Sequence, residues 1–173
     1  VQNRTHVANF TAGAQSPRFD NTAWRVIASD WRVSGILSAR SGPWLTVTTA
    51  RDIAATGISA QRLNQVLDDP YGTKTLTTYL NPAAFAYPAN GTLGDHTINS
   101  VEGPGFWAID VALSRLFSLA PTKNLEFRAE AFNLLNNFNW GIPATNYDLG
   151  TGGRITSTGG DPRIVQLAVK YAF

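Results

Sequence analysis

The sequence contains no cysteine and no methionine, and only 15% of its 173 residues are charged. The absence of cysteine excludes a disulfide framework and a cysteine metal site. Because ordinary soluble domains carry about 25% charged residues, the low charge, with many Gly, Asn, Thr and Ser residues, indicates strands joined by open loops. The net charge is only +2, and we find no Lys/Arg cluster, so the charge pattern does not indicate a nucleic-acid partner.

The sequence also lacks a long apolar run. No stretch approaches the roughly 18 apolar residues of a membrane-spanning helix. A membrane β-barrel remains compatible with this, because its strands alternate apolar and polar residues and average out in a hydropathy profile. The chain begins at Val1, with neither an initiator Met nor a signal peptide. We therefore expect residues 1–173 to be one domain-sized piece of a longer protein.

Several segments alternate between apolar and polar residues with a period of two, which predicts β-strands. When 106–119 is folded onto 123–134 so that 119 faces 123, residue 113 faces 129 and residue 111 faces 131, and the apolar faces coincide. The stretch 129–138 also fits a short helix. The predicted strands are residues 4–13, 30–40, 44–51, 106–119, 123–134 and 163–173.

The connections between these strands are alternately tight and long. The tight ones are 41–43 and 120–122, and the long ones are 14–29, 52–105 and 135–162. Successive antiparallel strands place alternate connections at opposite ends of a sheet, so one end should carry the tight turns and the other the long loops. This asymmetry is typical of outer-membrane barrels, which have short periplasmic turns and long extracellular loops. A soluble sandwich can show it by chance.

The alternation alone does not decide whether the apolar face meets lipid or a protein core. The strands, of about 9–13 residues, are close to the 9–11 that cross a bilayer with tilt. Aromatic residues gather near strand ends, as in membrane-interface girdles: Trp31, Trp44, Phe106, Trp107, Phe117, Tyr171 and Phe173. The opposing faces carry residues that suit a hydrated lumen wall: Asp110, Glu126, Arg128, Glu130, Gln166 and Lys170.

These observations predict an all-β fold. We expect an antiparallel, up-and-down membrane β-barrel segment of about six strands, with long loops at one end and tight turns at the other. Six strands are fewer than the smallest membrane barrels contain, so this would be a partial barrel. An open sheet would leave both edges unpaired and prone to aggregate, and we expect the isolated fragment to be insoluble without detergent.

The last segment ends on an aromatic residue that follows apolar residues at alternate positions. It resembles the signal by which bacterial outer-membrane barrels are assembled, in which the assembly machinery adds the last strand to its own open edge. The resemblance implies a bacterial outer-membrane location and a barrel-assembly partner. The matching residues are Val165, Leu167, Val169, Tyr171 and Phe173.

Longer stretches, spread over almost the whole chain, resemble the C-terminal barrel region of TonB-dependent outer-membrane receptors. The closest likeness is to the Oar-like group with a carboxypeptidase-regulatory-like N-terminal domain, common in Acidobacteria. The likeness is weakest over residues 1–13. The matching stretches, in order, are "WRVSGILSARSGPWLTV", "YLNPAAFAYP…GTLGD", "GPGFWAIDVALSRLF", "LEFRAEAFNLLNNFNWGIP" and "GRITSTGGDPRIVQLAVKYAF".

This resemblance implies a 22-stranded barrel closed around an N-terminal plug. Such receptors import a bulky solute, of the siderophore, saccharide or peptide class, with energy supplied by an inner-membrane TonB complex. The implied partners are outer-membrane lipid, the assembly machinery, the solute and the TonB complex, the last through parts outside this sequence. With about six strands, no plug and no TonB-contacting segment, residues 1–173 should represent the last quarter or so of a transporter.

Candidate chemical sites are few. His6 and His96 stand apart, without metal-ligand spacing, and we expect ordinary polar positions. Glu126 and Glu130 with Arg128 fit an acid–base group, but lumen-wall charges explain them better. The "GTGGR" at 150–154 lacks the Lys-Ser/Thr of a phosphate loop and is expected to be a flexible loop. We therefore predict no catalytic residues, no metal site and no cofactor, and no enzyme activity.

The 52–105 loop carries aromatic residues among Asn and Asp residues, a combination that suits contact with a sugar, siderophore or peptide. Alternatively, these side chains pack the loop onto the barrel rim. The candidate contact residues are Tyr71, Tyr79, Phe85 and Tyr87.

Two other functions stay open from the sequence. One is a structural or adhesive outer-membrane barrel without transport. The other is a soluble all-β ligand-binding module that buries its apolar stripes, in which Val111, Leu113, Phe127 and Val169 would meet inside a self-contained sandwich.

Overall fold

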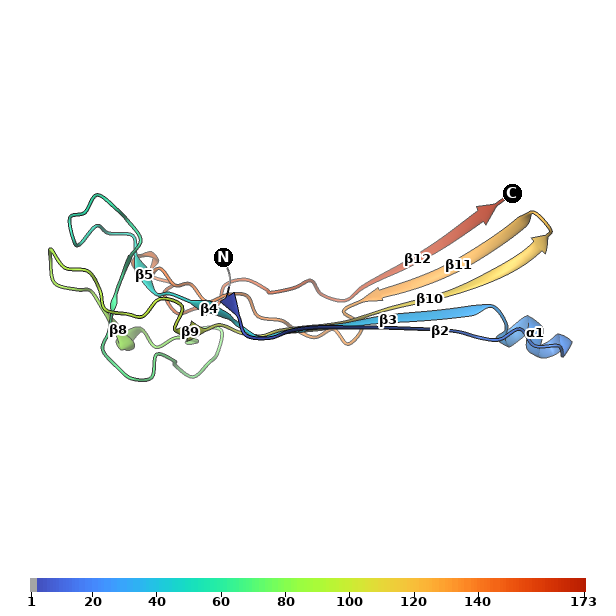
Figure 1. The fold of residues 1–173 in the computed structure, drawn as a ribbon, viewed down its shortest axis with the longest axis horizontal. Coiled ribbons are helices and arrows are strands. Elements are labelled where there is room, and N and C mark those ends of the chain that lie inside the picture. The colour runs from blue at the N-terminus through green and yellow to red at the C-terminus, as the bar shows by residue number, and fades with distance from the viewer. Residues whose placement is uncertain (1–2) are drawn as a thin grey trace. The chain divides into compact units, whose positions relative to one another are not determined.

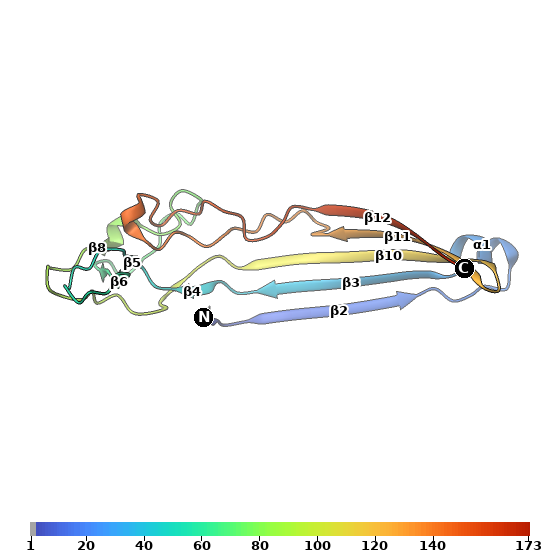
Figure 2. The same cartoon turned by 90° about the horizontal axis from the view of Figure 1, so that it is seen from above.

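The computed structural model describes residues 3–173, which form two compact units. We call them the sheet unit and the loop unit and describe each by itself; Figures 1 and 2 show their elements. The sheet unit comprises Val7–Ala39, Trp107–Asn137 and Asp161–Phe173. The loop unit comprises residues 3–6, Arg40–Phe106 and Phe138–Gly160.

The sheet unit is built on five long strands in the order β12-β11-β10-β3-β2. Each long strand lies beside the long strand that precedes or follows it in the chain, so the sheet is an antiparallel up-and-down meander (Figure 2). The all-β antiparallel prediction is confirmed, and the sheet is open, with β2 and β12 at its edges. The strands are β2 (Val7–Gln15), β3 (Trp31–Arg40), β10 (Phe106–Ala120), β11 (Lys123–Phe132) and β12 (Ile164–Ala172).

The register of the β10–β11 hairpin matches the one predicted from its apolar faces. Leu113 lies opposite Ala129, and Val111 lies opposite Ala131. The register shifts between Ser118 and Ala120, so the predicted pairing of 119 with 123 is wrong next to the turn. A bulge at a strand end changes the local pairing without turning the apolar face over.

Of the six predicted strands, five form the sheet, and 44–51 does not form a long strand. This segment contains two short strands of the loop unit, β4 (Pro43–Leu45) and β5 (Thr48–Thr49). Strand β4 pairs with β1 (Asn3–Arg4) and β9 (Val101–Glu102), and β5 pairs with β6 (Gln61–Arg62). The alternative helix at 129–138 is also not formed, since β11 continues to Phe132 and a turn follows.

The predicted distribution of connections is correct in part. Residues 16–30 join β2 to β3 and contain the short helix α1 (Thr22–Ala28), which Asn21 caps through its side chain. This connection lies at the same sheet end as the β10–β11 turn (Figure 1), so its expected place among the long loops is wrong. The prediction counted 41–43 as a tight turn between two long strands. Since 44–51 is not a long strand, the connections alternate between the sheet ends in a different order. Among the described residues, no helix is long and apolar enough to cross a membrane.

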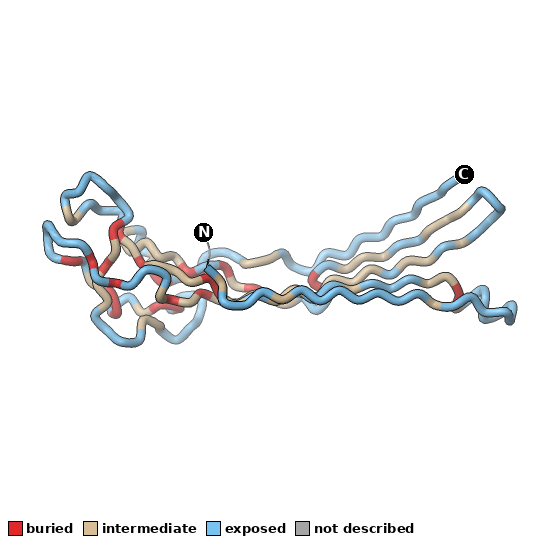
Figure 3. Tube along the Cα trace, viewed as in Figure 1, coloured by how far each residue is buried: buried red, intermediate tan, exposed pale blue. Residues whose placement is uncertain are grey.

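The loop unit has a hydrophobic core of its own, although it consists mostly of irregular chain. The buried positions cluster in this unit (Figure 3). Its remaining elements are β7 (Asn64–Gln65), which pairs with β8 (Phe85–Ala86), and the 3₁₀ helices η1 (Pro82–Ala84) and η2 (Tyr147–Leu149). The core is formed by Val47, Leu63, Tyr79, Leu80, Ala84, Phe85, Val101 and Ile155.

Backbone hydrogen bonds tie the two long connections of the loop unit together. Leu80 N donates to Gly153 O at 3.0 Å, and Ile155 N donates to Leu76 O at 2.8 Å. These contacts join residues from the connection after β3 to residues from the connection after β11. The 150–154 segment, expected as a flexible loop, forms a turn in which the buried Gly153 packs against Leu80.

Candidate membrane-facing surface and loop cluster

The apolar face of the sheet unit is continuous across β10, β11 and β12. Residues directly opposite each other on neighbouring strands lie on the same face, and the pairings place apolar side chains in rows. Of the four side chains that would meet inside a sandwich, Val111 is half-buried and three are exposed: Leu113 by 40%, Phe127 by 46% and Val169 by 62%. They do not meet inside a sandwich. The rows are Val111–Ala131–Val165, Leu113–Ala129–Leu167 and Phe117–Leu125–Tyr171.

Aromatic side chains accompany Arg115, which carries a charge on this apolar face. The Arg115 guanidinium lies 5.2 Å from the Trp31 ring centroid and 4.5 Å from that of Phe117. It also donates a hydrogen bond to Val26 O. An arginine over aromatic faces gains a cation–π attraction that partly replaces hydration. This explains how the face tolerates the charge that interrupts its apolar pattern near the turn.

The C-terminal residues with the expected assembly pattern lie where the alternation places them. Val165, Leu167, Val169 and Tyr171 all point to the apolar face of β12 and are exposed, and Phe173 follows the strand. The Tyr171 and Phe173 rings stack with centroids 5.8 Å apart. Their role as an assembly signal stays a prediction.

The opposite face of the sheet carries all six predicted lumen-wall residues. Arg128 and Glu130 form an ion pair with 2.6 Å between Nη2 and Oε1. Glu126 lies directly opposite Lys170 on β12. Asp110 Oδ1 accepts a hydrogen bond from Asn133 N at 2.8 Å, so it also fixes the chain where β11 ends. That this face lines a lumen stays a prediction.

Two of the four candidate ligand contacts are buried in the loop-unit core. Tyr79 and Phe85 are each 7% exposed, and burial raises the pKa of the Tyr79 hydroxyl to about 12. The sequence left contact and packing open for these residues, and these two side chains lie inside the loop unit. They pack the loop edge to face, Tyr79 against Trp140 and Phe85 against Tyr147. Sequence alone could not separate packing from contact, since both use the same residue types.

The other two aromatic candidates reach the surface to different extents. Tyr71 is partly buried, and its hydroxyl accepts a hydrogen bond from Glu102 N at 2.8 Å. Tyr87 is exposed, and its hydroxyl donates to Asp148 Oδ1 at 2.7 Å. Ligand contact by Tyr71 and Tyr87 stays a prediction.

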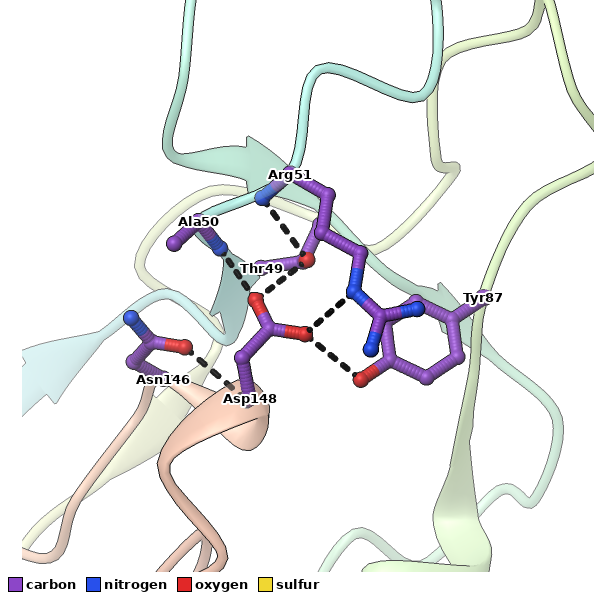
Figure 4. Close-up of polar contacts among 6 residues, drawn as sticks. All are labelled: Thr49, Ala50, Arg51, Tyr87, Asn146 and Asp148. Atoms are coloured by element: carbon purple, nitrogen blue, oxygen red, sulfur yellow. Dashed lines mark hydrogen bonds and ion pairs between the residues drawn. The ribbon is translucent and has the colours of Figure 1, made fainter.

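Asp148 is the centre of a polar cluster in the loop unit (Figure 4). Its Oδ2 accepts hydrogen bonds from Thr49 Oγ1 at 2.6 Å and from Ala50 N at 2.5 Å. Its Oδ1 lies 3.1 Å from Arg51 Nε and accepts the hydrogen bond from Tyr87. The Arg51 guanidinium lies 4.8 Å from the Tyr87 ring centroid. One carboxylate therefore joins three separate segments of the loop unit.

The electrostatics of Asp148 follow from these contacts. Burial raises the pKa of the carboxyl, but the hydrogen bonds from Thr49, Tyr87 and Ala50 and the charge of Arg51 outweigh it. The net pKa lies below the usual value of 3.8, so the ionised form is stabilised in the folded state. Sequence reasoning missed this cluster because Thr49 and Asp148 are far apart in the chain and match no motif.

His96 is a core residue of the loop unit and is only 1% exposed. Its Nδ1 lies 3.1 Å from Gln65 Oε1, and its ring meets Phe85 edge to face. His6 is exposed. Within residues 3–173, no group of three or more His, Cys, Asp or Glu side chains is placed to hold a metal ion.

Comparison with known proteins gives one match. The model of a family described as an outer membrane beta barrel domain matches residues 1–166. No curated protein and no solved structure matches the chain. The family match agrees with the two-faced antiparallel sheet and places the protein in the bacterial outer membrane. The chain belongs to the outer membrane β-barrel domain family.

Proposed function

We propose that the chain forms part of the wall of an outer-membrane active transporter of the TonB-dependent receptor type, of the Oar-like group. It takes part in the import of a bulky solute of the siderophore, saccharide or peptide class and catalyses no reaction. The observation that carries the proposal is the division of the sheet into two faces. Leu113, Ala129 and Leu167 share one face, while Glu130 and Gln166 share the other.

The open sheet supports a role as one part of a larger barrel. Five long strands are fewer than the eight of the smallest membrane barrels. The sheet edges at β2 and β12 need partner strands, because an unpaired edge in a bilayer leaves backbone N–H and C=O groups without hydrogen bonds. Strands from outside residues 1–173 complete the barrel, and the charged face then lines the solute path.

The loop unit supplies the extracellular part in this proposal. The two connections that build it are the longest in the chain, and long loops are extracellular in outer-membrane barrels. Its compact core holds exposed polar and aromatic side chains in fixed positions, with Tyr71 and Tyr87 as candidate solute contacts. The final strand is recognised during assembly through its apolar residues from Val165 to Phe173.

A structural or adhesive barrel without transport is the alternative, and it uses the same wall. A soluble binding module is disfavoured by the exposed apolar face of the sheet. Uptake by cells distinguishes a transporter from a structural or adhesive barrel. The gene is deleted and then restored, and uptake of a ⁵⁵Fe-siderophore, a fluorescent maltodextrin and a fluorescent peptide is measured with and without a protonophore.

For a transporter, at least one probe enters only when the gene is present, and the protonophore abolishes its entry. Unchanged uptake of all three probes, with altered cell adhesion in the deletion strain, contradicts transport.

The orientation of the sheet can be tested separately in the full gene product in cells. The variants Val169→Cys and Lys170→Cys place a thiol on adjacent residues of β12 that point to opposite faces. A water-soluble maleimide should label Lys170→Cys rapidly and Val169→Cys slowly, because lipid shields the second thiol. Equal labelling of both thiols contradicts the proposed lipid and lumen faces.

A further inference from the structure

The loop unit contains a cavity of about 320 Å³ whose lining shares no residue with the Asp148 cluster. The charged residues in its lining are two arginines, Arg4 and Arg40. The volume lies within the range of about 300–1,000 Å³ that is usual for small-molecule sites. The other side chains used below are Phe106, Trp140, Ser157 and Thr158.

The two arginines are held in place by neighbouring groups. Arg4 Nη1 donates to Ser41 O at 2.6 Å, and the Arg40 guanidinium lies 4.2 Å from the Phe106 ring centroid. Burial and then the positive charge of Arg40 lower the pKa of Arg4. The lining therefore combines two mutually repelling cations, and this repulsion falls when an anion enters between them.

The lining segments around Trp140 and Ser157 are also held by hydrogen bonds. Gly141 N donates to Ser157 O at 2.9 Å, and Gly159 N donates to Asn139 O at 2.7 Å. These bonds join the segment around Trp140 to the segment that carries Ser157 and Thr158. Because these bonds hold the segments together, binding has less of the wall to order, which favours affinity.

We propose that this cavity binds an acidic saccharide, with its carboxylate at Arg4 and Arg40. Guanidinium groups bind carboxylates through charge-assisted, often bidentate hydrogen bonds. Trp140 adds an aromatic residue to the lining, of the kind that packs against sugar rings, and the exposed residues Ser157 and Thr158 carry hydroxyls that match the sugar hydroxyls. Bare phosphate shares the oxyanion chemistry but uses neither the aromatic surface nor the hydroxyls.

The inference deepens the proposed function and rests on it, since the acidic saccharide would be the imported solute. The experiment measures binding and not uptake, so saccharide binding can fail while the proposed transport function holds, and the reverse. The full gene product is purified in detergent and titrated calorimetrically with tri-galacturonate, maltotriose and inorganic phosphate. The test variant is Arg40→Gln, and the matched control is Arg154→Gln, which removes the same charge from an exposed position of the loop unit outside the cavity.

We expect tri-galacturonate to bind the wild type at least tenfold more tightly than maltotriose does. Arg40→Gln should weaken tri-galacturonate binding about tenfold or more, because a charge-assisted hydrogen bond is lost, and Arg154→Gln should leave it unchanged. Heat-modifiable gel mobility confirms that both variants are folded. Equal binding by Arg40→Gln and the wild type, or no binding of tri-galacturonate to the wild type, overturns the inference. Phosphate binding as tight as that of tri-galacturonate overturns the saccharide assignment.

Discussion

Glu126 and Lys170 lie directly opposite each other on β11 and β12, while their sequence neighbours Phe127 and Val169 pair on the other face. A one-residue shift of register would exchange the two faces along the whole strand. The charged and apolar pairs therefore hold the same register from opposite sides of the sheet. In a bilayer the observed register is strongly preferred over a shifted one, because a shift would place charged side chains in hydrocarbon.

An added arginine should destabilise the protein on the apolar face of the sheet and have little effect on the opposite face. We expect Leu167→Arg, near the middle of β12, to lower the free energy of unfolding by about 2–4 kcal/mol, the cost of an arginine on the lipid face near the bilayer midplane. Its neighbour Gln166→Arg should change it by about 0.5 kcal/mol or less. Urea unfolding of the full gene product in lipid vesicles measures both. Equal losses for the two variants would show that β12 does not present one face to lipid.

The Asp148 cluster should stabilise the loop unit. Asp148→Asn removes the ionised acceptor of Thr49, Tyr87 and Arg51, and we expect a loss of about 1–3 kcal/mol, since hydrogen bonds to charged groups contribute on that scale. Asp68→Asn, which removes the same charge from an exposed position of the same unit, should have little effect. The rate of limited proteolysis within residues 50–60 provides the measurement. Similar cleavage of both variants would contradict a structural role for the cluster.

Acid should weaken the loop unit through His96. Burial, and then the charge of Arg62, lowers the pKa of His96 below 6.5, and Asp95 only partly opposes this. Below about pH 6.5 the unfolded segment therefore binds a proton that the folded one does not, so stability falls with falling pH down to the lower folded pKa. Hydrogen exchange of residues 61–66 should accelerate between pH 7 and pH 5, after correction for the intrinsic rate.

The variant His96→Gln should flatten this pH dependence, and His6→Gln should preserve it. The Asp148 contribution is distinct, because its lowered pKa means that its stabilisation is lost only as the pH falls through about 3.8 and below. If hydrogen exchange in His96→Gln still accelerated between pH 7 and pH 5, a group other than His96 would be responsible for the pH dependence.

Gly94 should not tolerate a side chain. A Cβ at this position would meet the carbonyl oxygens of Arg62 and Leu63, the latter at 2.5 Å. Backbone atoms cannot rotate away as side chains can, so we expect Gly94→Ala to cost about 2 kcal/mol or more. At Gly13 the added Cβ makes only ordinary contacts of 3.6 Å and longer. Gly13→Ala is thus the control, and the melting temperature of each variant is measured. A smaller fall in melting temperature for Gly94→Ala than for Gly13→Ala would contradict the predicted clash.

The long strands near the C-terminus were predictable because alternation and pairing agree there. Folding 106–119 onto 123–134 matched apolar with apolar at 113 and 129, and the structure has this pair. The 44–51 segment alternates as well, but its partners belong to the loop unit. Local alternation does not reveal which strand a segment will pair with, and so the count of long strands was one too high.

The loop unit was the least predictable part. Leu63, Tyr79 and Leu80 are spaced without any period, and their core partner Ile155 comes from a distant part of the chain. The signal that could have revealed a core is the number of large apolar residues within 52–105, which is high for a loop in open solvent. The partners of Asp148 and the cavity arginines depend entirely on tertiary contacts, and no sequence motif marks them.

The shared core of the loop unit has an evolutionary consequence. Surface loops of barrels usually vary one at a time, because each is anchored only at its own strand ends. Here Leu80 bonds to Gly153 and Ile155 bonds to Leu76, so an insertion in either connection displaces the packing partners of the other. Diversification of this surface therefore requires coordinated change in two stretches of sequence, or substitutions limited to side chains that point away from their common interior.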